Sequence, residues 1–390
     1  MLNPLRALFR GRYLPPQLAR LVPRRVRAFA PPRRYLSATD LAAGSILATE
    51  AAEPIPRLKL TLHGDVLDDG LGALSSEAPV NHVFALRHAR LRDADGHIIT
   101  QNNELVFDAG FWSRLRPRPD RDHSAYQLRK TPPAQHLPGL TVSIASDFAA
   151  GGYGHFIHDC LPRLRLLQLA GIDFTKADWI FCPRLPSATV DDLCDDLGIA
   201  RAKLLNHRPG WDYLCDQLIA TTYPGAVGTI APRDARFLET LGERWRQTPP
   251  FTRRVYLARA GCARNFLNEV EALTVLRQHG FEIIDPAAGR SALQACANAA
   301  VIAGIDGANL SSLAFAPATA RVLVIYPEQA PTLPYQLTLA ASAGREVHLF
   351  GPAPANQVRR TYLEGFCVLP ERFDACLATV CAGLPPPPLL

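Results

Sequence analysis

The stretch AVIAGIDGANLSSLAF, residues 300–315, is the part of this 390-residue sequence that decides the fold. Its first four residues are small or branched and apolar, and they predict a buried strand over Ala300–Ala303. A glycine-rich turn then leads into an apolar run that predicts a helix over Ala308–Phe315. A short apolar strand followed closely by a helix is typical of a parallel sheet covered by helices.

The same alternation continues on both sides of this stretch. We expect strands at Arg254–Ala258, Phe281–Ile284, Ala300–Ala303, Arg321–Tyr326 and Glu346–Phe350, with helices at 268–279, 291–297, 308–315 and 335–341 between them. Asn268 with Glu271 is typical of a capping box, and Gly280 stands where a helix should end. Five strands separated by helices predict a doubly wound parallel sheet and therefore an α/β fold.

The first half of the chain has weaker patterns. Three patterns predict a β-rich portion: alternating leucines at 58–62, a strand near 82–86, and a hairpin over His97–Phe107 that turns near 101–103. The basic, proline-rich segment 114–139 is expected to be a long loop. After it we expect strand 141–145, a helix ending at Leu169, strand 178–182, helix 189–197 and strand 217–222.

Length and composition predict two domains. A chain of 390 residues exceeds one ordinary hydrophobic core, and 48% hydrophobic with 20% charged residues is typical of globular proteins. We expect a basic, disordered arm over 1–36, a first domain over 37–228, a second domain over 229–384 with a closing helix, and a proline-rich tail over 385–390.

The net charge of +6 arises at the N-terminus, because residues 1–34 contain nine arginines and no acidic residue. The rest is nearly neutral, which argues against nucleic-acid binding but permits a weak contact between the arm and an anionic membrane surface. Without an apolar run long enough for a bilayer or a signal-peptide pattern, we expect a cytoplasmic location, with this peripheral contact as an option. Nine scattered cysteines without metal-ligand spacing indicate reduced thiols.

The motif GGYGHFIHDCLPR, residues 151–163, concentrates groups that carry chemistry. In a helix beginning near Tyr153, His155 and Asp159 are four residues apart and share a face with His158. A carboxylate that orients an imidazole is a common arrangement for removing a proton from a hydroxyl.

Other interpretations of this motif stay open. His155, His158 and Asp159 could bind zinc in a hydrolase, although the spacing differs from known zinc motifs. Cys160 could be a nucleophile, but residues two apart in a helix point in nearly opposite directions. The histidines could also be ordinary core or surface residues.

A second candidate site follows from the rule that ligands bind beyond the carboxyl ends of strands in an open parallel sheet. The loop Gly304–Asn309 precedes a helix, so its backbone amides could bind phosphate. Arg259 and Arg264 follow the first strand and could bind a diphosphate by charge-assisted hydrogen bonds. The same loop could be only a tight turn, and the arginines only surface charges.

Three motifs in order, Tyr153–Arg163, Val255–Glu269 and Gly304–Pro317, resemble glycosyltransferase family 61, which includes bacterial capsular-polysaccharide proteins. The similarity covers roughly residues 141–327. It implies an inverting, metal-independent enzyme of GT-B architecture, with two Rossmann-like domains facing across a cleft. The domain over 37–228 would be the acceptor-side domain, and the domain over 229–384 would bind the nucleotide-sugar. The similarity also implies a nucleotide-sugar donor, expected to be a UDP-sugar, and a glycan or other hydroxyl acceptor, with no cofactor required. The donor would be bound by Arg259, Arg264, Asn268, Glu269, Gly304, Asp306, Gly307, Ala308 and Asn309.

The sequence also departs from the family pattern. Gly152 replaces an asparagine in the first motif, and Asp306, Asn309 and Val324 replace the histidine, glycine and glutamate that are usual in or after the third.

The catalytic residues expected from the resemblance and from the helix spacing are His155 and Asp159, either of which could take the acceptor proton. The arginine-rich, alanine- and proline-rich composition is typical of a GC-rich bacterial genome, which favours surface or capsular polysaccharide synthesis. The alternatives are a metal-dependent hydrolase using His155, His158 and Asp159, and a catalytically inactive nucleotide-sugar-binding scaffold.

Overall fold

A computed structural model of the chain describes residues 32, 34–64, 76–116, 118–119, 123–126, 133–184, 187–226, 228–259, 265–326, 335–351 and 365–387. Almost all of the expected N-terminal arm, and Arg264 of the expected donor site, lie outside these residues. The chain divides into two compact units. Unit 1 contains residues 1–51, 80–185 and 199–224, and unit 2 contains residues 52–79, 186–198 and 225–390.

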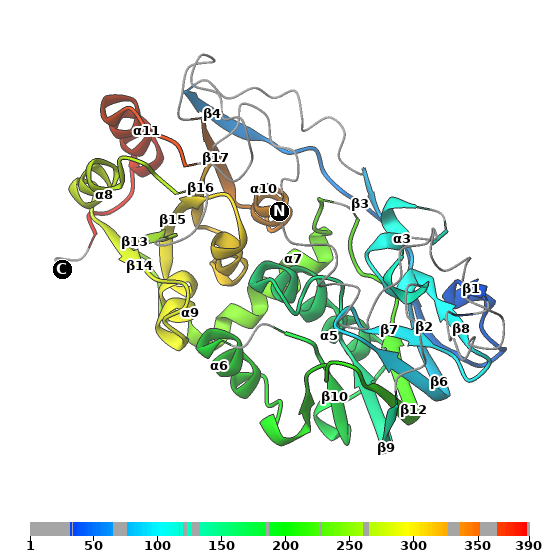
Figure 1. The fold of residues 1–390 in the computed structure, drawn as a ribbon. Helices are drawn as coiled ribbons and strands as arrows, with labels where there is room; N and C mark the ends of the chain where they lie inside the picture. Colours follow the sequence, from blue (N-terminus) through cyan, green and yellow to red (C-terminus); the bar gives the residue numbers. More distant parts are fainter. Residues whose placement is uncertain are drawn as a thin grey trace, which may run out of the picture. The chain divides into compact units, whose positions relative to one another are not determined.

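Unit 2 is built on a six-stranded sheet whose strands all run parallel (Figure 1). The strands in sheet order are β14 (Phe281–Ile284), β13 (Arg253–Leu257), β15 (Ala299–Ile305), β16 (Arg321–Ile325), β17 (Glu346–Gly351) and β4 (Leu60–Gly64). The central strands are apolar and fully buried, which is why short unbroken apolar runs predicted them. All five strands expected from the second half of the sequence are confirmed.

Helices follow the strands of this sheet, as expected for a doubly wound fold. They are α7 (Pro232–Gly242), α8 (Glu269–Gln278), α9 (Arg290–Ala297), the 3₁₀ helix η10 (Ala308–Phe315), α10 (Tyr335–Ser342) and α11 (Pro370–Cys381), with α6 (Ala188–Asp196) packed on α9. Helices α8 and α11 form one apolar core with the sheet. Helix α8 ends where Gly280 has a φ of 72°, so the expected helix end is confirmed.

The sixth strand of unit 2 comes from far away in the sequence. Strand β4 pairs with β17, and His63 Nε2 lies 3.0 Å from His348 Nδ1 across a separation of 285 residues. The segment that contains β4 also forms a small antiparallel pair, β3 (Glu53–Pro54) with β5 (Glu77–Ala78). Units 1 and 2 therefore differ from the contiguous ranges 37–228 and 229–384 expected from the sequence, because strand pairing joined a segment from the β-rich part to the second sheet.

Unit 1 contains a nine-stranded mixed sheet (Figure 1). Its main path is β1 (Arg34–Leu36), β8 (Glu104–Val106), β7 (His97–Ile99), β6 (Asn81–Arg92), β12 (Asp212–Thr221), β9 (Ala134–Ser143), β10 (Trp179–Phe181) and β11 (Leu204–Leu205), while β2 (Ile46–Glu50) pairs with β6. Strands β12, β9, β10 and β11 are parallel, whereas the β6–β8 part is antiparallel. The predicted hairpin over 97–107 is confirmed. The sheet combines parallel and antiparallel strands, so it is not the fully parallel sheet of a Rossmann-like domain.

Two expectations for this unit were wrong. Residues 134–139 belong to strand β9 rather than to a loop, because they pair with the first half of β12 despite their proline and glycine. Residues Arg34–Leu36, which fell in the expected disordered arm, form β1 beside β8. Edge-strand pairing of this kind has no strong local sequence signal.

The remaining helical segments of unit 1 are short, apart from the motif helix. They are α3 (Trp112–Leu115) and the 3₁₀ turns η2 (Ala38–Asp40), η4 (Phe107–Ala109), η5 (Ser124–Tyr126), η7 (Phe174–Lys176) and η8 (Arg201–Lys203). Within the described ranges, no helix combines the length and apolar character needed to cross a bilayer.

Candidate active site

The motif of residues 151–163 forms a helix with one widened turn. It consists of α4 (Tyr153–His155), the π-helical segment η6 (Phe156–Cys160) and α5 (Leu161–Leu169). Pro162 explains the widening, because it lacks the N–H that would bond the carbonyl of His158 and its ring would crowd that carbonyl in a regular α-helix. Such π-helical insertions are frequent at functional sites.

His155 and Asp159 meet on this helix as their spacing predicted. His155 Nδ1 lies 2.8 Å from Asp159 Oδ2, and Asp159 Oδ1 accepts a 2.7 Å hydrogen bond from the hydroxyl of Tyr223. The His155 side chain is 33% exposed, whereas that of Asp159 is 1% exposed. The structure therefore presents the imidazole to solvent and holds the carboxylate behind it.

The electrostatic environment favours a protonated imidazole at His155. Burial by itself would lower its pKa, but the hydrogen bond and negative charge of Asp159, with a further contribution from Asp147, raise the pKa above the ordinary histidine value. A histidine of raised pKa is a stronger proton acceptor when neutral.

The backbone before the helix leaves room for this ring. A Cβ at Gly152 would lie 3.1 Å from His155 Cδ2, closer than nearly all real contacts of this kind. Gly152, which replaces the usual asparagine of the family motif, therefore packs closely against the ring of His155.

Arg163 fixes the same helix to the neighbouring strand. It is buried, and its guanidinium donates to the backbone carbonyls of Asp159 at 3.2 Å, Thr221 at 2.9 Å and Ala109 at 2.8 Å. Because Thr221 ends β12 two residues before Tyr223, this contact holds the helix and the tyrosine in register.

The sequence analysis did not identify Tyr223, Asp147 or Phe148, which surround the pair. Phe148 has a ring centroid 5.3 Å from that of His155, and Asp147 is fully buried beside it. These residues follow the carboxyl ends of β9 and β12, which are parallel neighbours. The strand-end rule that we applied to the second half of the sequence would have found them in the first half as well.

The other residues of the motif are buried. His158 lies in the interior, where burial lowers its pKa to about 4, so its imidazole is neutral at physiological pH. Burial raises the pKa of the Cys160 thiol, which disfavours a nucleophilic thiolate. Among the described residues, His155, His158 and Asp159 are not grouped with the spacing of metal ligands.

In unit 2, Arg259 and the expected donor residues between Gly304 and Asn309 lie at the carboxyl ends of β13 and β15. The Arg259 guanidinium donates to the backbone carbonyl of Asp306 at 3.3 Å, and the Asn309 amide donates to that of Ala258 at 2.8 Å. Gly307 has a φ of 143°, which a residue with a side chain rarely adopts. Gly304 lies at the end of β15, and Asp306 and Gly307 form the turn after it. Ala308 and Asn309 begin η10, which is a 3₁₀ helix rather than an α-helix.

Asn268 and Glu269 lie at the start of α8, as expected, and their side chains bond to other residues of unit 2. The Asn268 side chain makes no cap, so the predicted capping box is wrong. It instead donates to the Val368 carbonyl at 2.9 Å and accepts from the Val368 N–H at 3.0 Å, which fixes the chain before α11. Glu269 accepts a 3.0 Å hydrogen bond from the Asn265 amide.

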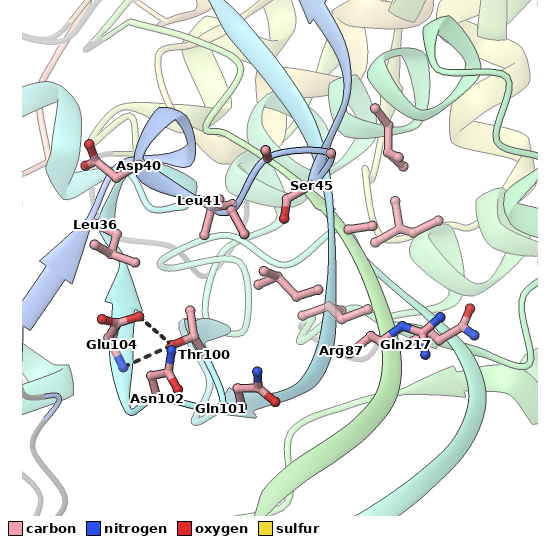
Figure 2. A pocket seen from close by; sticks show the side chains of 18 of the residues that line it. Leu36, Asp40, Leu41, Ser45, Arg87, Thr100, Gln101, Asn102, Glu104 and Gln217 are labelled. Carbon is pink, nitrogen blue, oxygen red and sulfur yellow. Dashed lines mark hydrogen bonds between the residues drawn. The ribbon is translucent and has the colours of Figure 1, made fainter.

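A separate cavity of about 730 Å³ opens on unit 1 (Figure 2). Leu36, Leu41 and Ser45 come from the first strands and loops, and Arg87 and Gln217 project from the paired strands β6 and β12. The residues that line this cavity include neither His155 nor Asp159. The cavity is therefore separate from the histidine–aspartate pair.

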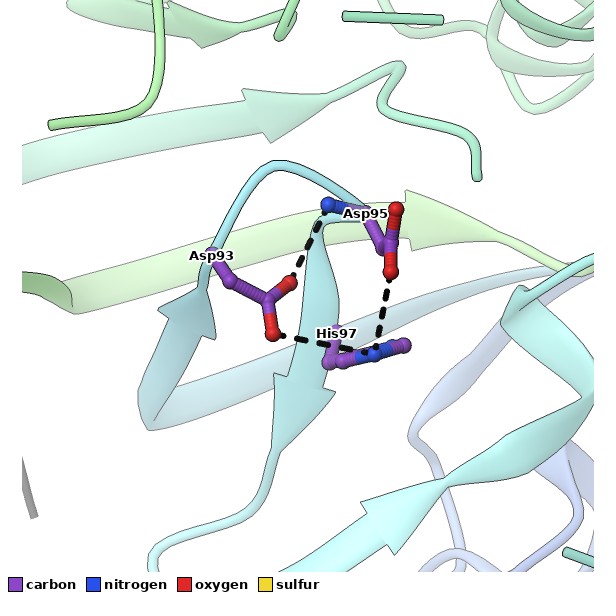
Figure 3. Close-up of side chains that lie close together, drawn as sticks. All are labelled: Asp93, Asp95 and His97. Atoms are coloured by element: carbon purple, nitrogen blue, oxygen red, sulfur yellow. Dashed lines mark hydrogen bonds and ion pairs between the residues drawn. The ribbon is translucent and has the colours of Figure 1, made fainter. Parts of the chain in front are cut away.

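One cluster among the described residues has the spacing of metal ligands, namely Asp93, Asp95 and His97 at the β6–β7 turn (Figure 3). His97 Nε2 lies 3.8 Å from Asp93 Oδ2 and 3.7 Å from Asp95 Oδ2, and 2.6 Å from the Ser124 hydroxyl. Burial opposes a charge on His97, but the carboxylate of Asp93 raises its pKa. Burial in turn raises the pKa of Asp93 to about 6, so the charges of the imidazole and this carboxyl group depend on each other.

The sequence comparison covers both groups of candidate residues. A family model described as Glycosyltransferase 61 matches residues 153–323, a range that contains His155, Asp159, Arg259 and the Gly304–Asn309 loop. No curated protein sequence matches the chain significantly. This match suggests glycosyltransferase activity, with a sugar donor and an acceptor as substrates. The match supports similarity of residues 153–323 to glycosyltransferase family 61.

Proposed function

We propose that the protein is an inverting glycosyltransferase in which His155 is the general base that activates an acceptor hydroxyl. The observation that carries this proposal is the chain of hydrogen bonds from His155 Nδ1 to Asp159 and from Asp159 to the Tyr223 hydroxyl. A base oriented by a buried carboxylate, which is itself fixed by a third group, is a recurring catalytic arrangement.

The reaction is a single displacement. As the acceptor oxygen forms a bond with the anomeric carbon, its proton passes to Nε2 of His155, and the bond from that carbon to the donor phosphate breaks. Asp159 stabilises the imidazolium that results, as the carboxylates of other catalytic histidines do. The nucleoside diphosphate leaves, and the anomeric configuration is inverted.

The exposure of the two side chains supports His155, rather than Asp159, as the base. Asp159 is 1% exposed and both of its oxygens accept hydrogen bonds, whereas His155 is 33% exposed. An acceptor can approach a partly exposed ring more easily than a buried carboxylate. Asp159 is then a positioning residue that acts through His155.

We propose that unit 2 binds the donor, a nucleotide-sugar such as a UDP-sugar. The leaving diphosphate would receive charge-assisted hydrogen bonds from Arg259 and backbone hydrogen bonds from the loop after Gly304. The support is the gathering of these groups at the carboxyl ends of β13 and β15. Because Arg259 supplies a fixed positive charge there, we expect no metal ion to be required.

A panel of nucleotide-sugars tests the proposal and separates it from the alternatives. We expect one donor to raise the melting temperature and to be slowly hydrolysed to nucleoside diphosphate, with full activity in chelator. The His155→Ala variant should bind the same donor without releasing diphosphate. Loss of activity in chelator would favour the metal-dependent hydrolase, and binding without release by the wild-type protein would favour the scaffold.

The pH dependence of kcat/KM is expected to show an acid limb above the ordinary histidine pKa of about 6.5. Only neutral His155 can accept a proton, and its pKa is raised, so activity should fall as the pH drops through that raised value. Measurements of kcat/KM from about pH 5 to 9 would locate the limb. A limb below the ordinary value, or a flat profile across this range, would contradict His155 as the base.

We propose surface or capsular polysaccharide synthesis as the setting, with the enzyme in the cytoplasm and the arginine-rich N-terminal segment resting on the membrane. Nine arginines without an acidic residue in 34 positions support the electrostatic part of this proposal.

A further inference from the structure

Phe148 is held in an unusual conformation beside the candidate base. Its φ is 67°, in the left-handed region, which is a rare conformation for a bulky side chain. Its side chain is nevertheless 41% exposed. Strained residues of this kind concentrate at functional sites, where the surrounding structure maintains them.

The surrounding structure fixes this loop at both ends. The buried carboxylate of Asp147 accepts a 2.5 Å hydrogen bond from the Phe111 N–H, and the Phe148 carbonyl accepts a 3.0 Å hydrogen bond from Gly151 N–H. The position of Phe148 is therefore defined by its neighbours and does not result from a loose loop.

Two more aromatic rings support the ring of Phe148. Phe111 and Trp112 contact it edge-on, with centroid distances of 5.7 Å and 5.8 Å. Phe111 is buried and also contacts Tyr223 at 5.6 Å, so it connects this aromatic group to the residue that orients Asp159. Edge-on packing fixes ring orientation better than nonspecific apolar contact does.

We propose that Phe148, supported by Phe111 and Trp112, is the stacking surface for a sugar ring of the acceptor, so that the acceptor is a glycan. This inference rests on the proposed function, because it names the substrate class of the His155 site. The ring of Phe148 lies 5.3 Å from the His155 ring between centroids, so a sugar stacked on it has a ring hydroxyl within reach of the base.

The composition of the surface favours a sugar over a lipid or a peptide hydroxyl. A pyranose has a face of C–H groups that packs on an aromatic ring and an edge of hydroxyls that form hydrogen bonds. The aromatic surface has polar groups at its border, namely the imidazole of His155 and the guanidinium of Arg116, which lies 5.7 Å from the Trp112 ring centroid. A lipid chain would require a longer apolar surface, and a serine or threonine side chain would leave the exposed ring uncovered.

The experiment compares Phe148→Leu, which keeps an apolar side chain without a ring, with Phe148→Trp, which keeps a ring. Binding of methyl glucoside, galactoside, mannoside and xyloside is followed by saturation-transfer NMR, with a threonine-containing peptide as the non-sugar probe. For the glycoside that binds wild type, we expect Phe148→Leu to weaken binding about tenfold and Phe148→Trp to retain it. The ring protons of one sugar face should receive the strongest saturation.

The matched control is Tyr35→Leu, because Tyr35 has the same 41% exposure in unit 1. It should leave glycoside binding unchanged. Hydrolysis of the nucleotide-sugar without acceptor is measured in parallel, and Tyr35→Leu should keep that rate within about twofold, because Tyr35 belongs to neither the candidate base nor the proposed stacking surface.

Three outcomes would overturn the inference: equal glycoside binding by Phe148→Leu and wild type, no glycoside binding by wild type, or preferential binding of the peptide. A loss of glycoside binding in Tyr35→Leu as large as that in Phe148→Leu would also overturn it, because the loss would then not depend on the proposed stacking surface. Absence of donor hydrolysis in wild type would instead reject the proposed function, while the binding measurements would still test the surface by themselves.

Discussion

Replacement of His155 by alanine is expected to lower kcat by about 10²- to 10⁴-fold, the usual contribution of a general base. The KM for the donor should change little, because the imidazole belongs to unit 1 and the expected phosphate-binding loop to unit 2. Asp159→Asn should also lower kcat, since the imidazolium loses the carboxylate 2.8 Å from its Nδ1. Release of nucleoside diphosphate under saturating donor gives both constants.

The chain contains a matched control for this experiment. His136 Nε2 lies 2.7 Å from Asp216 Oδ1, which is another histidine–aspartate pair of unit 1, but it is largely exposed on the paired strands β9 and β12. His136→Ala should retain wild-type kcat. If Asp159→Asn reduced kcat far more than His155→Ala did, the carboxylate and not the imidazole would be the base. Near-wild-type rates in both variants would reject the site.

Arg163→Met is expected to destabilise unit 1 by about 3 kcal/mol or more, because several buried carbonyls lose their donor together. Arg163 is 2% exposed and bonds Asp159, Thr221 and Ala109 through their carbonyls. Methionine fills similar space but donates no hydrogen bond. Denaturant unfolding gives the loss, and hydrogen exchange of peptides from 153–169 and 212–223 should locate it, since a chain of two units need not unfold in one step.

Arg165 provides the comparison two residues along the same helix. It donates two hydrogen bonds to Glu50, and the two side chains are 15% and 17% exposed, so Arg165→Met should cost less than Arg163→Met, about 1–2 kcal/mol. If Arg163→Met stayed within that range, the guanidinium would not be the link between the helix and β12, and another contact would have to position Tyr223.

The second half of the fold could be predicted from the sequence, because its central strands are buried on both faces. Ala300–Ala303 and Arg321–Tyr326 read as apolar runs bounded by turns, and the structure contains β15 and β16 at nearly those residues. The first half could not be predicted as well. Strands such as β1 and the start of β9 have partly exposed, polar sequences, and only their partners make them strands.

The candidate site was predictable where it depends on one helix. The spacing of His155 and Asp159 was sufficient, because residues four apart share a helix face regardless of the tertiary structure. Tyr223 and Phe148 come from different strand ends and meet the pair only through the sheet order. The side-chain contacts of Asn268 could not be predicted either. The family motif suggested that Asn268 binds a ligand, and the structure shows that its side chain forms hydrogen bonds with the backbone of Val368, 100 residues away.

The pairing of β4 with β17 has a consequence for how the protein is made. A ribosome synthesising about 5–20 residues per second would need roughly 15–60 s between His63 and its partner His348, 285 residues later. During that time the β4 segment has no strand beside it, and unit 2 cannot complete its sheet until β17 emerges. For the same reason, a gene fragment that starts at residue 225 would encode a unit 2 without its edge strand and without α6.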